Sequence, residues 1–150
     1  MSQSTDRPSV SAGAVICDEQ GRVLIVDPVY KPYWNLPGGG VEAGENAKDA
    51  CRREVLEELG LDLEIGRLLV HATVSVPGRE PHEYFVFDGG VLSAARQQAI
   101  RLQESELGAF RFSRPEDITD EEIPPSARRM WDAALAARAG TETIELAVTL

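Results

Sequence analysis

Basic residues are scarce in this chain, because 15 lysines and arginines stand against 25 aspartates and glutamates and leave a formal net charge of −10. A protein that binds DNA or RNA over an extended surface needs cations to neutralise the phosphate backbone. We therefore expect no nucleic-acid polymer as a partner. A small pyrophosphate compound is still compatible with this charge, since a divalent ion can bridge it to acidic side chains.

Long hydrophobic runs are also missing, and none approaches the roughly 20 residues that cross a bilayer. The first eight residues lack the apolar core of a signal peptide, and we expect a disordered lead-in over residues 1–8. We therefore expect a cytoplasmic protein without a membrane partner. With 150 residues, of which 43% are hydrophobic, the chain is expected to form one domain with a sizeable core.

Cysteine and histidine occur only twice each. Cys17 and Cys51 could pair by number alone, but a large core makes a disulfide unnecessary, so we expect both to be reduced and buried. His71 and His82 lie in strand-like stretches without a neighbouring Cys or Asp cluster. We expect them to be strand residues rather than metal ligands.

The chain is organised around a glycine-rich turn that leads into a helix crowded with carboxylates, over residues 38–61. Asn46 has the side chain of an N-cap, because its oxygen can accept from the first free amides of the helix. Gly60 suits the position after the helix, where the backbone turns left-handed. The sequence therefore predicts a helix over residues 46–59.

Three carboxylates share one face of this helix, since Glu54, Glu57 and Glu58 are spaced i, i+3 and i+4. At about 100° per residue, the same arc holds small and apolar residues, namely Ala47, Ala50, Cys51, Val55 and Leu59. Three like charges about 6 Å apart repel by about 2 to 3 kcal/mol per pair at an effective dielectric of about 20. A solvated acidic face is the alternative, but inward carboxylates need a cation, and oxygen-only ligands select Mg²⁺ or Mn²⁺.

The glycines at residues 38–43 also fit a loose dinucleotide fingerprint, Gly-x-Gly-x-x-Ala. Glu42 and Glu45 argue against it, because they stand where a pyrophosphate would approach the helix start and would repel it without a metal. A Walker-type phosphate loop is excluded, since no Gly-Lys-Ser/Thr follows.

A longer pattern covers the turn and the helix together. From Gly39 the chain reads glycine, five residues, Glu45, seven residues and then Arg-Glu-Val-Leu-Glu-Glu-Leu-Gly-Leu over residues 53–61. This resembles the Nudix box, the signature of Nudix hydrolases, at every fixed position. The resemblance implies an α/β/α sandwich with a mixed sheet and a site for divalent metal.

The resemblance also implies a role for each matching residue. In Nudix hydrolases the box glutamates bind the divalent ions and take part in catalysis, and here those are Glu54, Glu57 and Glu58. The early glutamate, Glu45, lies behind the ligands in some members and touches the metal in others. Arg53 matches the arginine that orients a glutamate, as its i, i+4 relation to Glu57 permits.

Two further ligands are implied outside the box glutamates. One is the backbone carbonyl of the glycine before the box, Gly38. The other is a carboxylate from a later loop, for which Glu104 and Glu106 are candidates; we prefer Glu106 because it lies six residues before Phe112, at the start of an aromatic strand.

The implied reaction is attack of a metal-activated water on a nucleoside diphosphate linked to another group X, with Mg²⁺ or Mn²⁺ as cofactor. Either a box glutamate or Glu106 serves as the base. Nucleoside triphosphates, nucleotide sugars and dinucleotides all remain open as substrates. The rival hypothesis is a non-catalytic module of the same fold that binds a nucleotide-derived ligand.

Substrate contacts are expected from loops outside the box. Tyr30, Tyr33 and Trp34 are candidates for stacking on a base, although Trp34 beside a strand suits the core equally well. Arg79 is a candidate for a phosphate or ribose contact.

The rest of the chain predicts strands around two helices. We expect strands over residues 10–17, 22–27, 34–36, 61–76, 83–87, 99–102 and 110–112, and a second helix over residues 123–138. Residues 141–150 alternate like a strand, which could pair with a sheet edge or with a second subunit of a homodimer, or else form a disordered tail. An α/β/α sandwich on a mixed sheet is the most economical arrangement.

Overall fold

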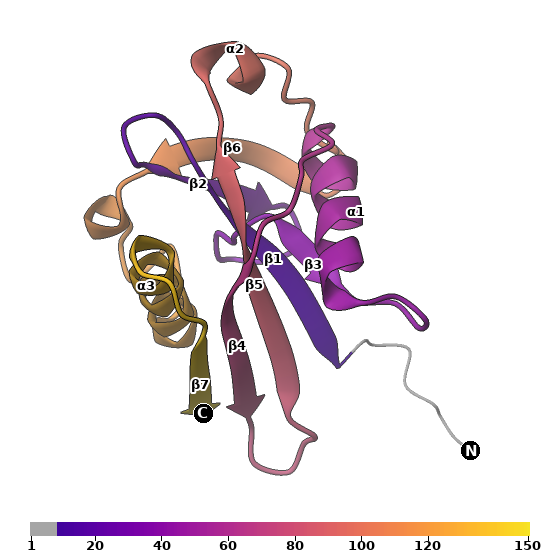
Figure 1. The fold of residues 1–150 in the computed structure, drawn as a ribbon. Coiled ribbons are helices and arrows are strands. Elements are labelled where there is room, and N and C mark those ends of the chain that lie inside the picture. Colours follow the sequence, from indigo (N-terminus) through magenta and orange to yellow (C-terminus); the bar gives the residue numbers. More distant parts are fainter. Residues whose placement is uncertain (1–8) are drawn as a thin grey trace.

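The computed structural model describes residues 9–150, so the expectation for residues 1–8 lies outside the described part. Within this described part, seven strands and three helices follow one another (Figure 1). The elements are β1 (Val10–Cys17), β2 (Val23–Pro28), β3 (Gly38–Gly40), α1 (Ala47–Leu59), β4 (Leu68–Ser75), β5 (His82–Val91), α2 (Ala94–Gln97), β6 (Leu107–Ser113), a 3₁₀ turn (Pro115–Asp117), α3 (Pro125–Ala139) and β7 (Ile144–Thr149).

The strands form one mixed sheet in the order β6-β2-β1-β5-β4-β7, with β3 paired to β1. β1 runs parallel to β5 and β4 runs parallel to β7, while the remaining pairs are antiparallel. The turn from β1 to β2 is fixed by Asp18, whose carboxylate accepts from the amides of Gln20 and Arg22 at 3.0 and 2.8 Å. The two strands predicted on either side of this turn, over residues 10–17 and 22–27, are thus confirmed as an antiparallel pair.

The two long helices lie on opposite faces of the sheet, α1 on one side and α3 on the other (Figure 1). Successive side chains of β1 point to opposite faces of the sheet. Ala14 and Ile16 therefore pack on the α1 side, whereas Val15 and Cys17 pack with the residues of α3. The α/β fold with a mixed sheet between helices, predicted from the sequence, is therefore confirmed.

Local signals set the ends of α1. The Asn46 side chain accepts from the Asp49 amide at 2.8 Å, and Gly60, with φ of 71°, donates its amide to the Leu56 carbonyl at 2.9 Å. These are the N-cap and the left-handed residue that the sequence predicted. The helix therefore presents its carboxylates in the predicted register.

The strand predicted over residues 99–102 is wrong. This stretch follows α2 as an irregular segment along the end of α1, where Arg101 donates its amide to the Leu59 carbonyl at 2.7 Å. Buried Ile100 explains the apolar signal without a strand. The segment thus caps the carbonyl end of α1 instead of extending the sheet.

Other predictions need smaller changes. The strand expected from residue 61 begins only at Leu68, because the Gly66 amide bonds to the Asp88 carbonyl at 2.8 Å and the chain before it lies outside the sheet. Residues 144–149 form strand β7, which pairs with β4 of the same chain, so this stretch is a strand of the sheet and not a disordered tail.

Cys17 and Cys51 are free and buried, as predicted. Within residues 9–150, every helix is too short or too polar to serve as a membrane span.

Candidate active site

The short strand β3 and the helix α1 hold two glutamates close together. The Glu58 carboxylate accepts from the Gly38 amide at 2.8 Å, and Glu58 is only 7% exposed. The Glu54 carboxylate lies directly over Gly39, where a Cβ on the strand would clash with it. Glycine at this position therefore leaves room for a carboxylate against the backbone.

Both glutamates lie in surroundings that disfavour their charge. Burial raises the pKa of Glu58 to about 8, with further increase from Glu54 and Glu106, although the Gly38 amide opposes it. Burial likewise raises the pKa of Glu54 to about 7, helped by the charge of neighbouring Glu57. The charge of Arg53 opposes the increase for Glu54, whereas only a backbone amide opposes it for Glu58, so an added cation would favour the ionised pair.

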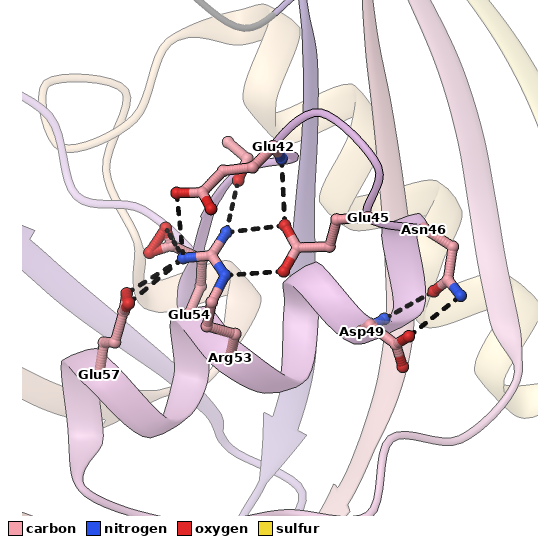
Figure 2. Close-up of polar contacts among 8 residues, drawn as sticks. Glu42, Glu45, Asn46, Asp49, Arg53, Glu54 and Glu57 are labelled. Atoms are coloured by element: carbon pink, nitrogen blue, oxygen red, sulfur yellow. Dashed lines mark hydrogen bonds and ion pairs between the residues drawn. The ribbon is translucent and has the colours of Figure 1, made fainter.

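Arg53 organises the carboxylates on the outer side of the same helix (Figure 2). Its guanidinium donates to both oxygens of Glu45, at 2.8 and 2.9 Å, and to the Gly40 carbonyl at 3.0 Å. It also donates to Glu57 at 3.2 Å and stands 3.7 Å from Glu54. The predicted i, i+4 contact between Arg53 and Glu57 is thus present.

The paired charges of this network stabilise one another's ionised forms. Hydrogen bonds from Arg53 lower the pKa of Glu45 to about 2, and bonds to Glu45 raise the pKa of Arg53. Glu45 also accepts from the Glu42 amide at 3.0 Å, which fixes the turn ahead of α1. Both oxygens of Glu45 therefore already accept hydrogen bonds from within the protein.

The loop acid Glu106 lies on the side of the paired glutamates. Its charge raises the pKa of both Glu54 and Glu58. The Glu106 carbonyl accepts from the Val29 amide at 2.8 Å, so the turn before β6 is tied to the loop after β2. Both loop acids considered, Glu104 and Glu106, are exposed, and of the two only Glu106 is among the charges that raise the pKa of Glu54 and Glu58.

The residues fit a hard divalent cation by their chemistry. Within residues 9–150, no three His, Cys, Asp or Glu side chains stand close enough to form a ready coordination sphere. Nevertheless, Glu54 and Glu58 offer carboxylate oxygens at one spot, without a compensating side chain for Glu58. Oxygen-only donors with uncompensated negative charge are what Mg²⁺ and Mn²⁺ require.

A cavity of about 350 Å³ opens beside Glu58. It lies between the α3 side of the sheet and the start of α3, and its walls include Ser11, Tyr30, Lys31, Asn35, Tyr84, Met130 and Trp131. A second hollow of about 450 Å³ lies on the outer face of α1 and is lined by Lys48, Asp49, Arg52, Asp62, Glu64 and Ile65. We place the ligand site in the first, because the buried carboxylate of Glu58 and the glycines of β3 line that one and not the second.

The predicted substrate contacts lie at different places. The Trp34 ring packs under Arg111, whose guanidinium carbon is 4.7 Å from the ring centroid, and against the core on the α3 side. Tyr33 is 40% exposed, and Arg79 lies in the exposed turn between β4 and β5. Tyr30 is the candidate that does line the cavity.

Sequence reasoning missed the residues that form most of the cavity wall. Tyr84 comes from β5 and Trp131 from α3, and each belongs to a regular pattern that indicates only core packing. Lys31 belongs to no sequence motif that would have singled it out. Only the pairing of β1 with β5 and the position of α3 bring these residues together.

A mixed sheet between two helices, with glutamates of one helix held against a glycine strand, defines a Nudix-type α/β protein. The chain belongs to this family, since residues 7–134 match the family model described as the NUDIX domain.

Individual relatives agree with this assignment. The chain is 30% identical over 115 residues to the RNA pyrophosphohydrolase of Edwardsiella ictaluri (strain 93-146); the aligned part covers 73% of this chain and 64% of that protein. The chain thus spans slightly less than two thirds of this relative's length.

Solved structures resemble the whole fold. The MutT protein from Methanosarcina mazei Go1 has a TM-score of 0.70 and 26% identity, covering 93% of this chain and 100% of that one. The MutT NUDIX hydrolase from Burkholderia pseudomallei has a TM-score of 0.67 and 26% identity, covering 87% and 98%.

Proposed function

We propose that this chain is a metal-dependent enzyme that hydrolyses the pyrophosphate linkage of a nucleoside diphosphate joined to another group. The observation that carries the proposal is the pair Glu54 and Glu58, held against the glycine strand β3, with the buried Glu58 also lining a cavity. Relatives named as a pyrophosphohydrolase and as Nudix hydrolases support the reaction class.

The ligands of the divalent ion would be Glu54, Glu57 and Glu58 from α1, the Gly38 carbonyl and Glu106, and Mg²⁺ or Mn²⁺ suits this oxygen set. When bound, such an ion lowers the pKa of an attacking water and neutralises charge on the phosphates. The contribution of the protein itself would be to hold these glutamates in position.

Positioning follows from the contacts around the glutamates. The Gly38 amide fixes Glu58, and Arg53 holds Glu57 and Glu45 from the outer side. The proton of the attacking water passes to Glu106 or to a box glutamate. Substitution of Glu106 separates these two assignments.

The cavity supports a single nucleoside as the bound part of the substrate. Its volume of about 350 Å³ lies at the lower end of ligand pockets. Tyr84 and Trp131 offer aromatic surfaces to a base, while Asn35 offers an amide for hydrogen bonding. The net charge of −10 favours a small nucleotide over a long RNA, even though a relative is named as acting on RNA.

A panel of substrates in Mg²⁺ tests the proposal. It contains nucleoside triphosphates, nucleotide sugars, dinucleotides and a 5′-triphosphorylated RNA oligonucleotide, and products are measured by chromatography. We expect turnover of at least one small nucleotide, lost on chelation. No turnover of any compound would overturn the enzyme assignment, and binding without turnover would establish the non-catalytic module instead.

A further inference from the structure

Ser11 is a half-buried residue of the cavity wall whose hydroxyl is held by a histidine. It lies on β1, and its Oγ is 2.8 Å from Nε2 of His82 at the start of the neighbouring strand β5 (Figure 1). Ser11 lines the cavity, whereas His82 is not one of the lining residues and packs its ring on Tyr84, with centroids 4.6 Å apart. The imidazole thus fixes a hydroxyl that a ligand in the cavity can reach.

The strand register sets the distance from Ser11 to the end of the cavity that carries Glu58. The Gly38 amide donates to the Glu58 carboxylate, and Gly38 pairs with Gly13 of β1. Ser11 lies two residues before Gly13, so both face the same side of the sheet, about 7 Å apart. In a nucleotide the ribose joins the phosphates to the base. A phosphate bound at the glutamates therefore places the sugar close to Ser11.

The state of His82 decides what the Ser11 hydroxyl offers to a ligand. Burial lowers the pKa of His82, helped by the charge of Lys31 and opposed by that of Glu83, so the ring is neutral at pH 7. A neutral ring nitrogen either accepts the Ser11 proton or donates its own to the Ser11 oxygen. The hydroxyl then presents lone pairs to the cavity in the first case and a proton in the second. A ligand hydroxyl suits both cases, because it can donate and accept.

We propose that Ser11, oriented by His82, hydrogen-bonds a ribose hydroxyl and so recognises the sugar of the substrate. This inference rests on the proposed function, since the glutamates define the phosphate end. The bond to His82 uses only part of the hydrogen-bonding capacity of the Ser11 hydroxyl, and the rest is available to a ligand. A nucleotide that lacks the contacted hydroxyl leaves this capacity unpaired, and the site discriminates against it for that reason.

Removal of the hydroxyl from the protein and from the ligand tests the contact. ATP, GTP, CTP and UTP are each compared with their 2′-deoxy and 3′-deoxy forms in Mg²⁺, for wild type and Ser11→Ala. With the complete ribose, Ser11→Ala should lower kcat/KM about 3 to 10-fold, the scale of one hydrogen bond, mainly through KM. With at least one deoxy form the same substitution should change kcat/KM less than about 2-fold, because the contact is already missing.

A His82→Phe variant separates orientation of the hydroxyl from packing. Phenylalanine keeps a ring on Tyr84 and removes the nitrogen that bonds to Ser11. We expect a smaller loss than in Ser11→Ala, confined to the same sugars, and no further loss of sugar preference when both substitutions are combined. An equal loss on ribose and on both deoxy forms would show that His82 acts only through packing.

The matched control is Ser9→Ala. Ser9 lies two residues before Ser11, is exposed and is not one of the residues that line the cavity. Its carbonyl accepts from the Glu83 amide at 3.0 Å, a backbone bond that alanine retains. Ser9→Ala should therefore behave like wild type on every sugar. Equal loss on ribose and on both deoxy forms in Ser11→Ala, or no loss on any of them, would overturn the sugar contact.

The two proposals can fail separately. If none of these nucleotides is hydrolysed, their dissociation constants in Mg²⁺, measured by calorimetry, replace kcat/KM. The same selective weakening in Ser11→Ala would then support the sugar contact without the enzyme assignment. Turnover in which Ser11→Ala matches wild type on all three sugars would remove the sugar contact alone, and so would a failure of every nucleotide in this set to bind or react.

Discussion

The buried carboxylate of Glu58 should make the metal-free protein lose stability as pH rises. Its folded-state pKa is about 8, raised by burial above an ordinary value of 4.5. The folded protein therefore holds this proton more tightly than the unfolded chain does. The stabilisation is fully present below about pH 4.5 and is lost as pH rises towards 8.

The magnitude follows from the same shift. Each pKa unit corresponds to about 1.4 kcal/mol, so between pH 4.5 and pH 7 the raised pKa of Glu58 lowers the free energy of unfolding by about 3 kcal/mol, because the unfolded chain releases a proton that the folded protein still holds. Glu58→Gln removes the charge, and its side-chain oxygen can still accept from the Gly38 amide, which now bonds to Glu58 at 2.8 Å. We expect this variant to exceed wild type in stability at pH 7 to 8 and to match it near pH 4.5.

Urea unfolding in chelator, from pH 4.5 to 8, measures this difference. Glu121→Gln, which alters an exposed glutamate, is the matched control and should follow wild type. Millimolar Mg²⁺ should stabilise wild type at pH 7.5 and have little effect on Glu58→Gln, because the ion has lost an anionic ligand. A wild-type stability that stays flat over this pH range, or parallel curves for Glu58→Gln and wild type, would refute the reasoning.

Three further outcomes are expected. Glu106→Gln should lower kcat by roughly 100-fold, as for a lost general base, and Glu104→Gln should change it little; the opposite ranking in steady-state assays would assign the loop acid to Glu104. Arg53→Lys should lower kcat about 10 to 100-fold, because lysine cannot make the paired bonds to a carboxylate, and normal turnover would show that charge alone suffices. His71 donates towards carboxylates on both neighbouring strands, at 2.8 Å each, and these bonds raise its pKa. Its contribution to stability should therefore be complete below about pH 6.5 and be lost as pH rises through the raised value, and a His71→Gln variant with the same pH profile as wild type would contradict this.

The parts of the site that were predictable depend on local chain geometry. Helical spacing alone brings Arg53 to Glu57, and the caps at Asn46 and Gly60 set the helix register. The sequence pattern also places glycines before the helix. It contains no information on how close Glu54 comes to Gly39, because that distance depends on how α1 packs on β3.

The cavity was unpredictable for a different reason. Its walls come from β1, β5, α3 and the loop after β2, which are far apart in the sequence. Tyr84 and Trp131 show the same periodicity as core residues, since a cavity wall is a core surface with nothing packed on it. The strand predicted over residues 99–102 was wrong for a similar reason. Burial of one apolar side chain against a helix end gives the same sequence pattern as a short strand.

The carboxylates of α1 and of the turn before it are compensated in two different ways, and this division suits the helix to an exchangeable ion. On the outer side, Arg53 neutralises Glu45 permanently and supports Glu57 through bonds of 2.8 to 3.3 Å. On the inner side, Glu58 has only a backbone amide, so the metal-free protein holds its carboxyl protonated until the pH approaches 8. An arginine placed there would stabilise the fold but leave no place for a cation. The protein thus retains a destabilising carboxylate at the cavity, and its stability should respond to divalent ions for that reason.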